Sequence, residues 1–206
     1  MDKLDLYEML LRVPPLLFAL TVHEYAHAWM AWRCGDPTAK HQGRLTLNPL
    51  VHLDLIGAIC LLFAPFGWAK PVPVNPYNFR NPRRDDILVS LAGVAANLGT
   101  AIVVALLLRA LSALGILPAS AAGRALWIMA FVLLSISVGL AIFNLIPVPP
   151  LDGSHVLANM LPWDKRAAYE RAAPVFSVVL LALIVTGAVD VILNPPHAFI
   201  LHLLGF

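Results

Sequence analysis

The stretch His23-Glu24-Tyr25-Ala26-His27 carries the residue types of a zinc site at the spacing that a helix requires. On a helix, His23 and His27 lie one turn apart on the same face, so both imidazoles can bind one metal ion while Glu24 stands beside them as a general base. Zinc held by three protein ligands keeps a fourth position for water, lowers the pKa of that water to about 7 and polarises a carbonyl group. The motif therefore predicts hydrolysis with one Zn²⁺ per chain, and it requires a third ligand.

The segments on either side of this motif are apolar. Residues 16–20 and 28–32 contain only apolar side chains, so the motif lies in a stretch typical of a membrane-buried helix. A chance occurrence of the motif is the alternative explanation. Ionisable groups within a membrane segment are costly and usually serve a function, so these surroundings favour a metal site.

The composition indicates an integral membrane protein. Of the 206 residues, 60% are hydrophobic and only 13% are charged, which is far more apolar than a soluble domain of this size. The net charge of +2 is scattered along the sequence, so we expect no nucleic-acid partner. Cys34 and Cys60 lack a paired spacing, which argues against a disulfide framework and a thiolate metal site. We expect a single membrane domain over residues 1–206.

Four segments are expected to cross the membrane as helices. The first covers residues 6–34, carries the histidine motif near its C-terminal end and is kinked by Pro14 and Pro15. Residues 87–114 and 126–146 are long enough to span about 30 Å of hydrocarbon at about 1.5 Å per residue. The fourth covers residues 175–193 and should stop at Pro195 and Pro196. The fold class is thus an all-α polytopic membrane protein with about four transmembrane helices.

Shorter elements are expected between the first two of these helices. Residues 41–49 are polar with a short alternating run, which predicts a β-hairpin or edge strand near the membrane boundary. Residues 56–68 are apolar but interrupted by Gly57, Pro65 and Gly67, and they fit a re-entrant element better than a full span. Residues 69–84 contain four prolines and should be irregular or extended.

Asp152 is the candidate for the third ligand. Pro147, Pro149 and Pro150 end the helix over residues 126–146 and bring this aspartate to membrane depth. A carboxylate would complete a His, His, Asp set that leaves the position for water open. The alternative is that Asp152 caps the N-terminus of a following helix, a role that aspartate often fills.

Five motifs together resemble the site-2 protease family of intramembrane zinc metalloproteases, in particular its small prokaryotic members without a PDZ domain. The resemblance implies an endopeptidase that hydrolyses peptide bonds in or near transmembrane helices of substrate proteins. It implies His23, His27 and Asp152 as zinc ligands and Glu24 as the catalytic base. The motifs, in order, are HEYAH at 23–27, GRLTLNPLVHLD at 43–54, GWAKPVPVNP at 67–76, SLAGVAAN at 90–97 and FNLIPVPPLDGS at 143–154.

Further polar residues are expected around the site. The resemblance points to Asn97 and Asn144 as groups that contact the substrate or the oxyanion. His52 and His155 are candidates for supporting a ligand without binding the metal, and a purely structural role is the alternative for both.

The sequence departs from the family pattern at two positions. Val94 and Leu55 stand where the family usually has proline. Neither is an expected ligand, so we expect these differences to alter helix kinks or substrate access and not activity itself.

Loop charges predict the orientation of the chain. Ten of the fourteen basic residues fall at one end of the expected helices, the end that carries His27. By the positive-inside rule this end faces the cytoplasm. We therefore expect a multi-pass protein of the prokaryotic inner membrane, with its active site toward the cytoplasmic side and the lipid bilayer and a transmembrane substrate as partners.

A metal-binding membrane protein without peptidase activity is the competing interpretation. A zinc transporter would more naturally repeat ionisable groups along several spans or show an inverted repeat, and the sequence shows neither pattern. An inactive homologue would usually lack the glutamate or a ligand, and all of these residues are present. The peptidase interpretation is therefore favoured.

Overall fold

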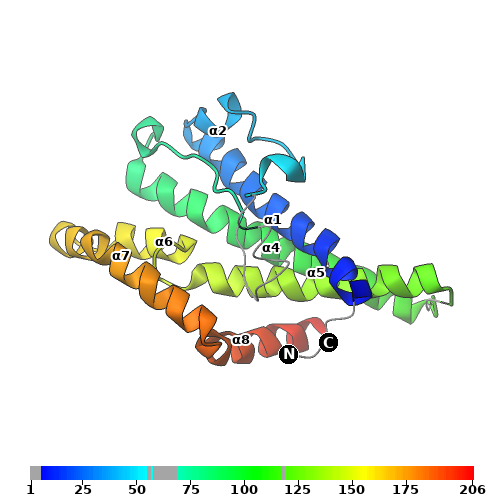
Figure 1. Cartoon of the computed structure of the whole chain (residues 1–206). Coiled ribbons are helices and arrows are strands. Elements are labelled where there is room, and N and C mark those ends of the chain that lie inside the picture. Colours follow the sequence, from blue (N-terminus) through cyan, green and yellow to red (C-terminus); the bar gives the residue numbers. More distant parts are fainter. Residues whose placement is uncertain (1–5, 55–56, 58–68, 117–118) are drawn as a thin grey trace.

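The computed structural model describes residues 6–54, 57, 69–116 and 119–206, and these residues are mostly helical (Figure 1). The first segment, α1 (Leu6–Cys34), is followed by the short α2 (Thr38–His41) and by two 3₁₀ turns, η1 (Pro49–Val51) and η2 (Pro76–Asn78). The remaining helices are α4 (Pro82–Ala113), α5 (Ala121–Leu145), α6 (Asp152–Met160), α7 (Trp163–Val185) and α8 (Ala188–Leu204).

The first predicted helix is confirmed, because α1 begins at Leu6 and ends at Cys34 with Pro14 and Pro15 inside it. Gly35 follows with a φ of 111°, a backbone conformation that glycine adopts far more readily than other residues. The irregular segment predicted at residues 69–84 is confirmed up to Asn81, and the next long helix begins at Pro82, earlier than the predicted start at residue 87. That helix, α4, begins after Asn81, whose side chain accepts a hydrogen bond from the amide of Arg84.

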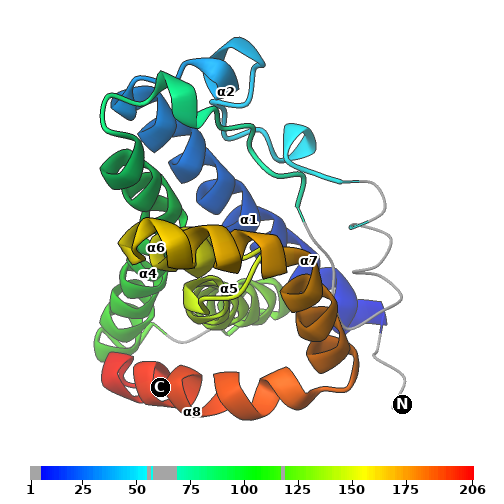
Figure 2. The same cartoon turned by 90° about the vertical axis from the view of Figure 1, so that its left-hand side faces the viewer.

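The centre of the molecule is built from α1, α4 and α5, with α8 packed against α5 (Figure 2). Ala101 and Ala105 of α4 are buried against Leu134 and Val138 of α5. Small side chains let the two helices approach closely, which is a common basis of helix packing in membranes. This core holds α4 against α1, so that α4 can contact the histidine motif.

Among the described residues, three helices are long and apolar enough to cross a membrane: α4, α5 and α7. The length of α1 would also suffice, but it is not among the three, since its apolar run is interrupted by His23, Glu24 and His27. Large apolar side chains along α7, such as Val175, remain exposed, as expected of a surface that faces lipid. The helical membrane-protein class is thus supported, with three candidate spans among the described residues where about four were expected.

The predicted hairpin or edge strand at residues 41–49 is wrong for the structure described here. His41 ends α2, Gly43 turns the chain with a φ of 69°, and Asn48 caps the 3₁₀ turn that starts at Pro49. An isolated antiparallel bridge joins Leu53 to Ala69, and no strand occurs in the described ranges. The polar residues of this segment occupy turn and cap positions. Their spacing gave the alternation of polar and apolar residues that resembled a strand. The predicted re-entrant element at 56–68 lies outside the described residues, apart from Gly57.

The last predicted span differs in its boundaries. A single helix, α7, includes the polar segment from Trp163 onward and ends at Val185. The chain then turns at Gly187, with a φ of 72°, and continues as α8 through Pro195 and Pro196. The left-handed glycine, and not the proline pair, therefore sets the end of the span.

Contacts bring the end of α1, the start of α4, α6 and the start of α7 together at one end of the molecule. The carbonyl of Cys34, at the end of α1, accepts a hydrogen bond from the amide of Arg80 just before α4. Asn159 of α6 donates to Asp86 near the start of α4 and accepts from Arg166 near the start of α7. The end of α4 and the start of α5 lie at the opposite end (Figure 1).

Candidate metal centre

His23, His27 and Asp152 converge although more than a hundred residues separate the histidines from the aspartate. The Nε2 atoms of the two histidines lie 2.9 Å apart, and Asp152 Oδ2 lies 3.2 Å from that of His23 and 3.3 Å from that of His27. Both histidines are buried, with 5% and 8% of their surface exposed. The three expected ligands therefore form one compact set of donor atoms.

The hydrogen bond of His27 fixes which of its ring nitrogens can bind a metal. Nδ1 lies 2.8 Å from the backbone carbonyl oxygen of Val89 in α4. A carbonyl oxygen can only accept, so Nδ1 carries the proton and Nε2 presents a lone pair toward Asp152. A backbone carbonyl on the far nitrogen is the usual support of a histidine that binds a metal.

The donor set fits a zinc ion. Asp152 Oδ2 is buried and has no hydrogen-bond donor, although two imidazole nitrogens lie beside it. Atoms with lone pairs repel one another at these separations unless a cation lies between them. Two histidines and one carboxylate are a known ligand set of catalytic zinc, which keeps one position for water.

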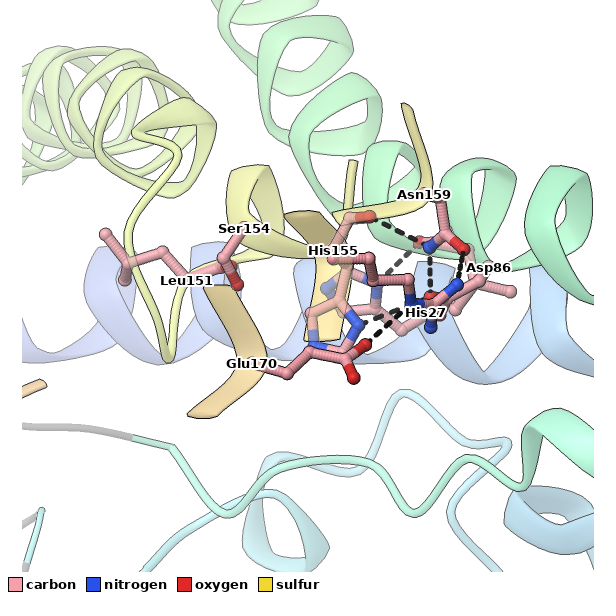
Figure 3. Close-up of polar contacts among 9 residues, drawn as sticks. His27, Asp86, Leu151, Ser154, His155, Asn159 and Glu170 are labelled. Atoms are coloured by element: carbon pink, nitrogen blue, oxygen red, sulfur yellow. Dashed lines mark hydrogen bonds and ion pairs between the residues drawn. The ribbon is translucent and has the colours of Figure 1, made fainter. Parts of the chain in front are cut away.

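Asp152 is held in place by the start of α6. Leu151 occupies the N-cap position, and Asp152 is the first helical residue, so the structure does not support the alternative of an aspartate N-cap. Figure 3 shows Leu151 and Ser154 at this turn, where the Ser154 hydroxyl donates to the Leu151 carbonyl at 2.6 Å. A Cβ atom at Gly153 would collide with the carbonyl of Leu145, so this glycine lets α6 start directly against the end of α5.

Gly93 supports the histidines, a role that sequence analysis did not identify. A Cβ atom here would lie 2.5 Å from Nε2 of His27 and 2.6 Å from Cε1 of His23. Such distances leave no room for any side chain, so the two imidazoles pack directly on the backbone of α4. The sequence spacing could have indicated this role. Residues 89, 93 and 97 are four positions apart, so Val89, Gly93 and Asn97 share one face of the helix.

Glu24 faces a cavity of about 460 Å³ that also contains the three candidate ligands. Its Oε2 accepts a hydrogen bond of 2.9 Å from the backbone amide of Val72. Pro71, Val72 and Val74 also line this cavity. Glu24 thus lies between the ligand histidines and an extended segment of the chain.

Residues 69–75, the extended segment, are held at both ends by buried charged groups. The guanidinium of Arg44 donates to the carbonyls of Lys70, at 2.6 Å, and of Pro71, at 3.2 Å. At the other end, the fully buried carboxylate of Asp36 accepts from the amide of Asn75 at 2.7 Å. These contacts fix the position of Val72 between them.

Asp36 is a hub of hydrogen bonds outside the membrane spans. Besides Asn75, it accepts from the amide and hydroxyl of Thr38 and from the side chain of Asn78. Burial alone would raise the pKa of Asp36, but these hydrogen bonds favour the carboxylate and hold the pKa below its ordinary value.

The two predicted asparagines occupy different environments. Asn144 lines the cavity, and one of its two amide N–H groups donates to the Leu140 carbonyl at 3.0 Å. Asn97 is fully buried, is not part of the cavity lining and has its amide nitrogen 3.2 Å from Nδ1 of His23. The sequence motifs predicted both residues near the site. In the structure, Asn144 lines the cavity, whereas Asn97 lies behind His23.

His155 and His52 also differ in their surroundings. His155 lines the cavity, and its Nδ1 lies 3.4 Å from Asp86 Oδ2, a contact that raises the pKa of His155 (Figure 3). His52 is buried away from the ligand set: its Nε2 lies 2.9 Å from the Thr46 carbonyl oxygen, and its Nδ1 lies 3.4 Å from Nη2 of Arg44. Because a carbonyl only accepts, Nε2 carries the proton, and His52 supports Arg44 and not a ligand.

Comparison with known proteins agrees with this geometry. The model of peptidase family M50 matches residues 111–187. "Putative zinc metalloprotease YwhC" of Bacillus subtilis is 40% identical over 198 residues, which cover 95% of this chain and 90% of that protein. "Putative zinc metalloprotease Rip2" of Mycolicibacterium smegmatis is 33% identical over 84% of this chain and 66% of its own length. No solved structure matches the chain. The chain belongs to peptidase family M50, the site-2 protease family.

Proposed function

We propose that this protein is an intramembrane zinc endopeptidase that hydrolyses peptide bonds in or near transmembrane helices of other proteins. The observation that carries the proposal is the convergence of His23, His27 and Asp152 beside Glu24, in a cavity of a helical membrane protein. The names of the relatives as zinc metalloproteases support the same activity.

His23, His27 and Asp152 would hold one zinc ion per chain. Bound zinc acts as a Lewis acid toward the scissile carbonyl and lowers the pKa of a water molecule at its open position. The two histidines are buried and Asp152 is partly buried, and all three lie on helices that pack against α4 or α5. The site is therefore organised before any substrate arrives.

Glu24 is the general base of the proposed reaction. One of its carboxylate oxygens is occupied by the Val72 amide, and no partner for the other is found among the described residues. The second oxygen is thus available to take a proton from the attacking water and later to deliver it to the leaving amine. A positioned base of this kind contributes about 10²–10⁴-fold to a rate.

Asn144 is suited to stabilise the oxyanion of the tetrahedral intermediate. It lines the same cavity as Glu24, and its carboxamide has a second N–H donor beyond the one given to Leu140. A donor aimed at the developing negative charge in a site that excludes water lowers the barrier by a few kcal/mol.

The substrate must present an extended peptide to this site. A helical peptide bond is shielded by its own hydrogen bonds, so the substrate helix has to unwind locally before hydrolysis. Substrates with helix-weakening residues near the cleaved bond should therefore be preferred.

Cleavage of a reconstituted model transmembrane peptide tests the proposal. The zinc-loaded protein should cut within or at the edge of the membrane span, with the position mapped by mass spectrometry, and a chelator should abolish cleavage until zinc is restored. A protein that binds one zinc ion and transports it across vesicles without cutting any peptide would instead be a transporter. One that binds zinc and does neither would be an inactive homologue.

We also propose that the protein lies in the prokaryotic inner membrane with the catalytic end toward the cytoplasm. The contacts that gather the basic helix ends support this orientation. Single cysteines placed at residues 164–171 should react with a reagent added on the cytoplasmic side, whereas one at Ala119 should not. The reverse labelling pattern would overturn the orientation.

A further inference from the structure

We infer that Asn97 is a positioning residue of the metal centre: its amide oxygen accepts a hydrogen bond from Nδ1–H of His23 and so keeps Nε2 free for the metal. The inference rests on the proposed zinc site. It assigns Asn97 a contact with a ligand, and not with the substrate.

Burial excludes Asn97 from substrate contact. The residue has 0% of its surface exposed and is separated from the cavity by His23. A side chain in this place can act on the reaction only through the imidazole that it touches.

The unpaired atom of the amide indicates how Asn97 contacts His23. Its nitrogen lies 3.2 Å from His23 Nδ1, while its buried oxygen has no hydrogen-bond partner. The opposite orientation of the amide exchanges these two atoms without a change of shape and gives the oxygen a ring N–H donor. Only that orientation is compatible with metal binding, because a proton on Nδ1 leaves the lone pair on Nε2.

Both histidines then receive the same kind of support from α4. The carbonyl of Val89 accepts from Nδ1 of His27, and the amide oxygen of Asn97 accepts from Nδ1 of His23. Gly93 lies midway between these two acceptors and gives the imidazoles the space to lie on the helix. One face of α4 thus selects the metal-binding tautomer of both ligands.

Zinc affinity of Asn97 variants tests this inference without any activity measurement. Asn97→Leu has nearly the same size but no acceptor, and it should bind zinc about 10–100-fold more weakly in competition with a chelator. Asn97→Asp offers an acceptor on both carboxylate oxygens, so its zinc affinity should equal or exceed that of the wild type. Ser137→Ala is the control, since it also removes a buried polar group from the bundle and should leave affinity unchanged.

Cobalt provides a second measurement. Co²⁺-loaded wild type and Asn97→Asp should show the same d–d absorption spectrum, whereas Asn97→Leu should show an altered or weakened one. If Asn97→Leu does not fold, as judged by thermal unfolding of the metal-free protein, Asn97→Ala takes its place.

Two results would overturn the inference. The first is unchanged zinc affinity in Asn97→Leu. The second is a loss in Asn97→Asp as large as in Asn97→Leu, which would mean that the amide donates to His23. A wild type that binds zinc and cleaves peptide while Asn97 variants behave normally would remove this inference alone, whereas a wild type that binds no zinc would remove the proposed function.

Discussion

The backbone amide of Val72 donates a hydrogen bond of 2.9 Å to Glu24 across 48 residues of sequence. Pro71 and Pro73 flank Val72 and lack N–H groups, so Val72 supplies the one amide donor of this tripeptide. Lys70 and Pro71 are anchored through their carbonyls by Arg44. The proposed base is therefore oriented by the backbone of a clamped segment.

Val72→Pro should lower the catalytic rate without loss of zinc. The substitution removes the N–H donor to a carboxylate, an interaction of about 1.5–3 kcal/mol, which corresponds to about a 10–100-fold change in kcat. Val72→Ala keeps the amide and should lose much less. Peptide cleavage and zinc content would be measured on both variants. Equal rates for the two variants would show that the amide does not orient Glu24.

Arg44→Met should reproduce the effect of Val72→Pro from a distance. It frees the carbonyls of Lys70 and Pro71 and so releases the segment that carries Val72. We expect kcat to fall by about tenfold or more with zinc content retained. Lys40→Met, at an exposed position of α2, is the control. Parallel loss of zinc and activity in Arg44→Met would indicate a general loss of structure instead.

Gly93→Ala should weaken zinc binding. Its Cβ atom would lie 2.5 Å from His27 Nε2 and 2.6 Å from His23 Cε1, so the backbone or the rings would have to move. We expect at least a roughly tenfold loss of zinc affinity, within the range seen when the support of a ligand is removed. Gly99→Ala on the same helix meets no atom within 4 Å and is the matched control. Equal zinc affinity in the two variants would contradict the packing described here.

Asp36→Asn should destabilise the protein in a pH-dependent way. The folded pKa of Asp36 is lowered, so its carboxylate stabilises the fold above its ordinary pKa of 3.8, and this stabilisation declines as the pH falls through the folded pKa. At pH 7 the variant should unfold more easily by about 1–3 kcal/mol. Thermal unfolding measured from pH 7 to about pH 3 should show this difference shrinking below about pH 4. A difference that stays constant over that range would show that the charge of Asp36 is not the cause.

The convergence of the three candidate ligands could be predicted from the sequence because each residue lies in a recognisable local pattern. His23 and His27 follow from helical spacing, and Asp152 from a proline break that carries it to the same depth. Hydropathy likewise predicted α4 and α5, since apolar runs of that length have few alternative structures.

Contacts between residues far apart in the sequence, which position the site residues, could not be predicted from local patterns. The contact between Val72 and Glu24 depends on how Arg44 and Asp36 anchor a proline-rich segment, and no local pattern states which carbonyls they will reach. The end of α7 differs from the predicted one because Gly187 adopts a left-handed conformation and turns the chain, while Pro195 and Pro196 lie inside α8.

Glu24→Gln tests the central claim most directly. The substitution preserves size and should leave folding and zinc content intact, while cleavage of a transmembrane peptide falls by at least about 10²–10⁴-fold. Glu170→Gln, on the exposed side of α7, makes the same chemical change away from the cavity and should cleave like the wild type. Zinc-loaded wild type that cleaves no membrane peptide, and behaves the same as Glu24→Gln, would contradict the assignment of this protein as an intramembrane protease.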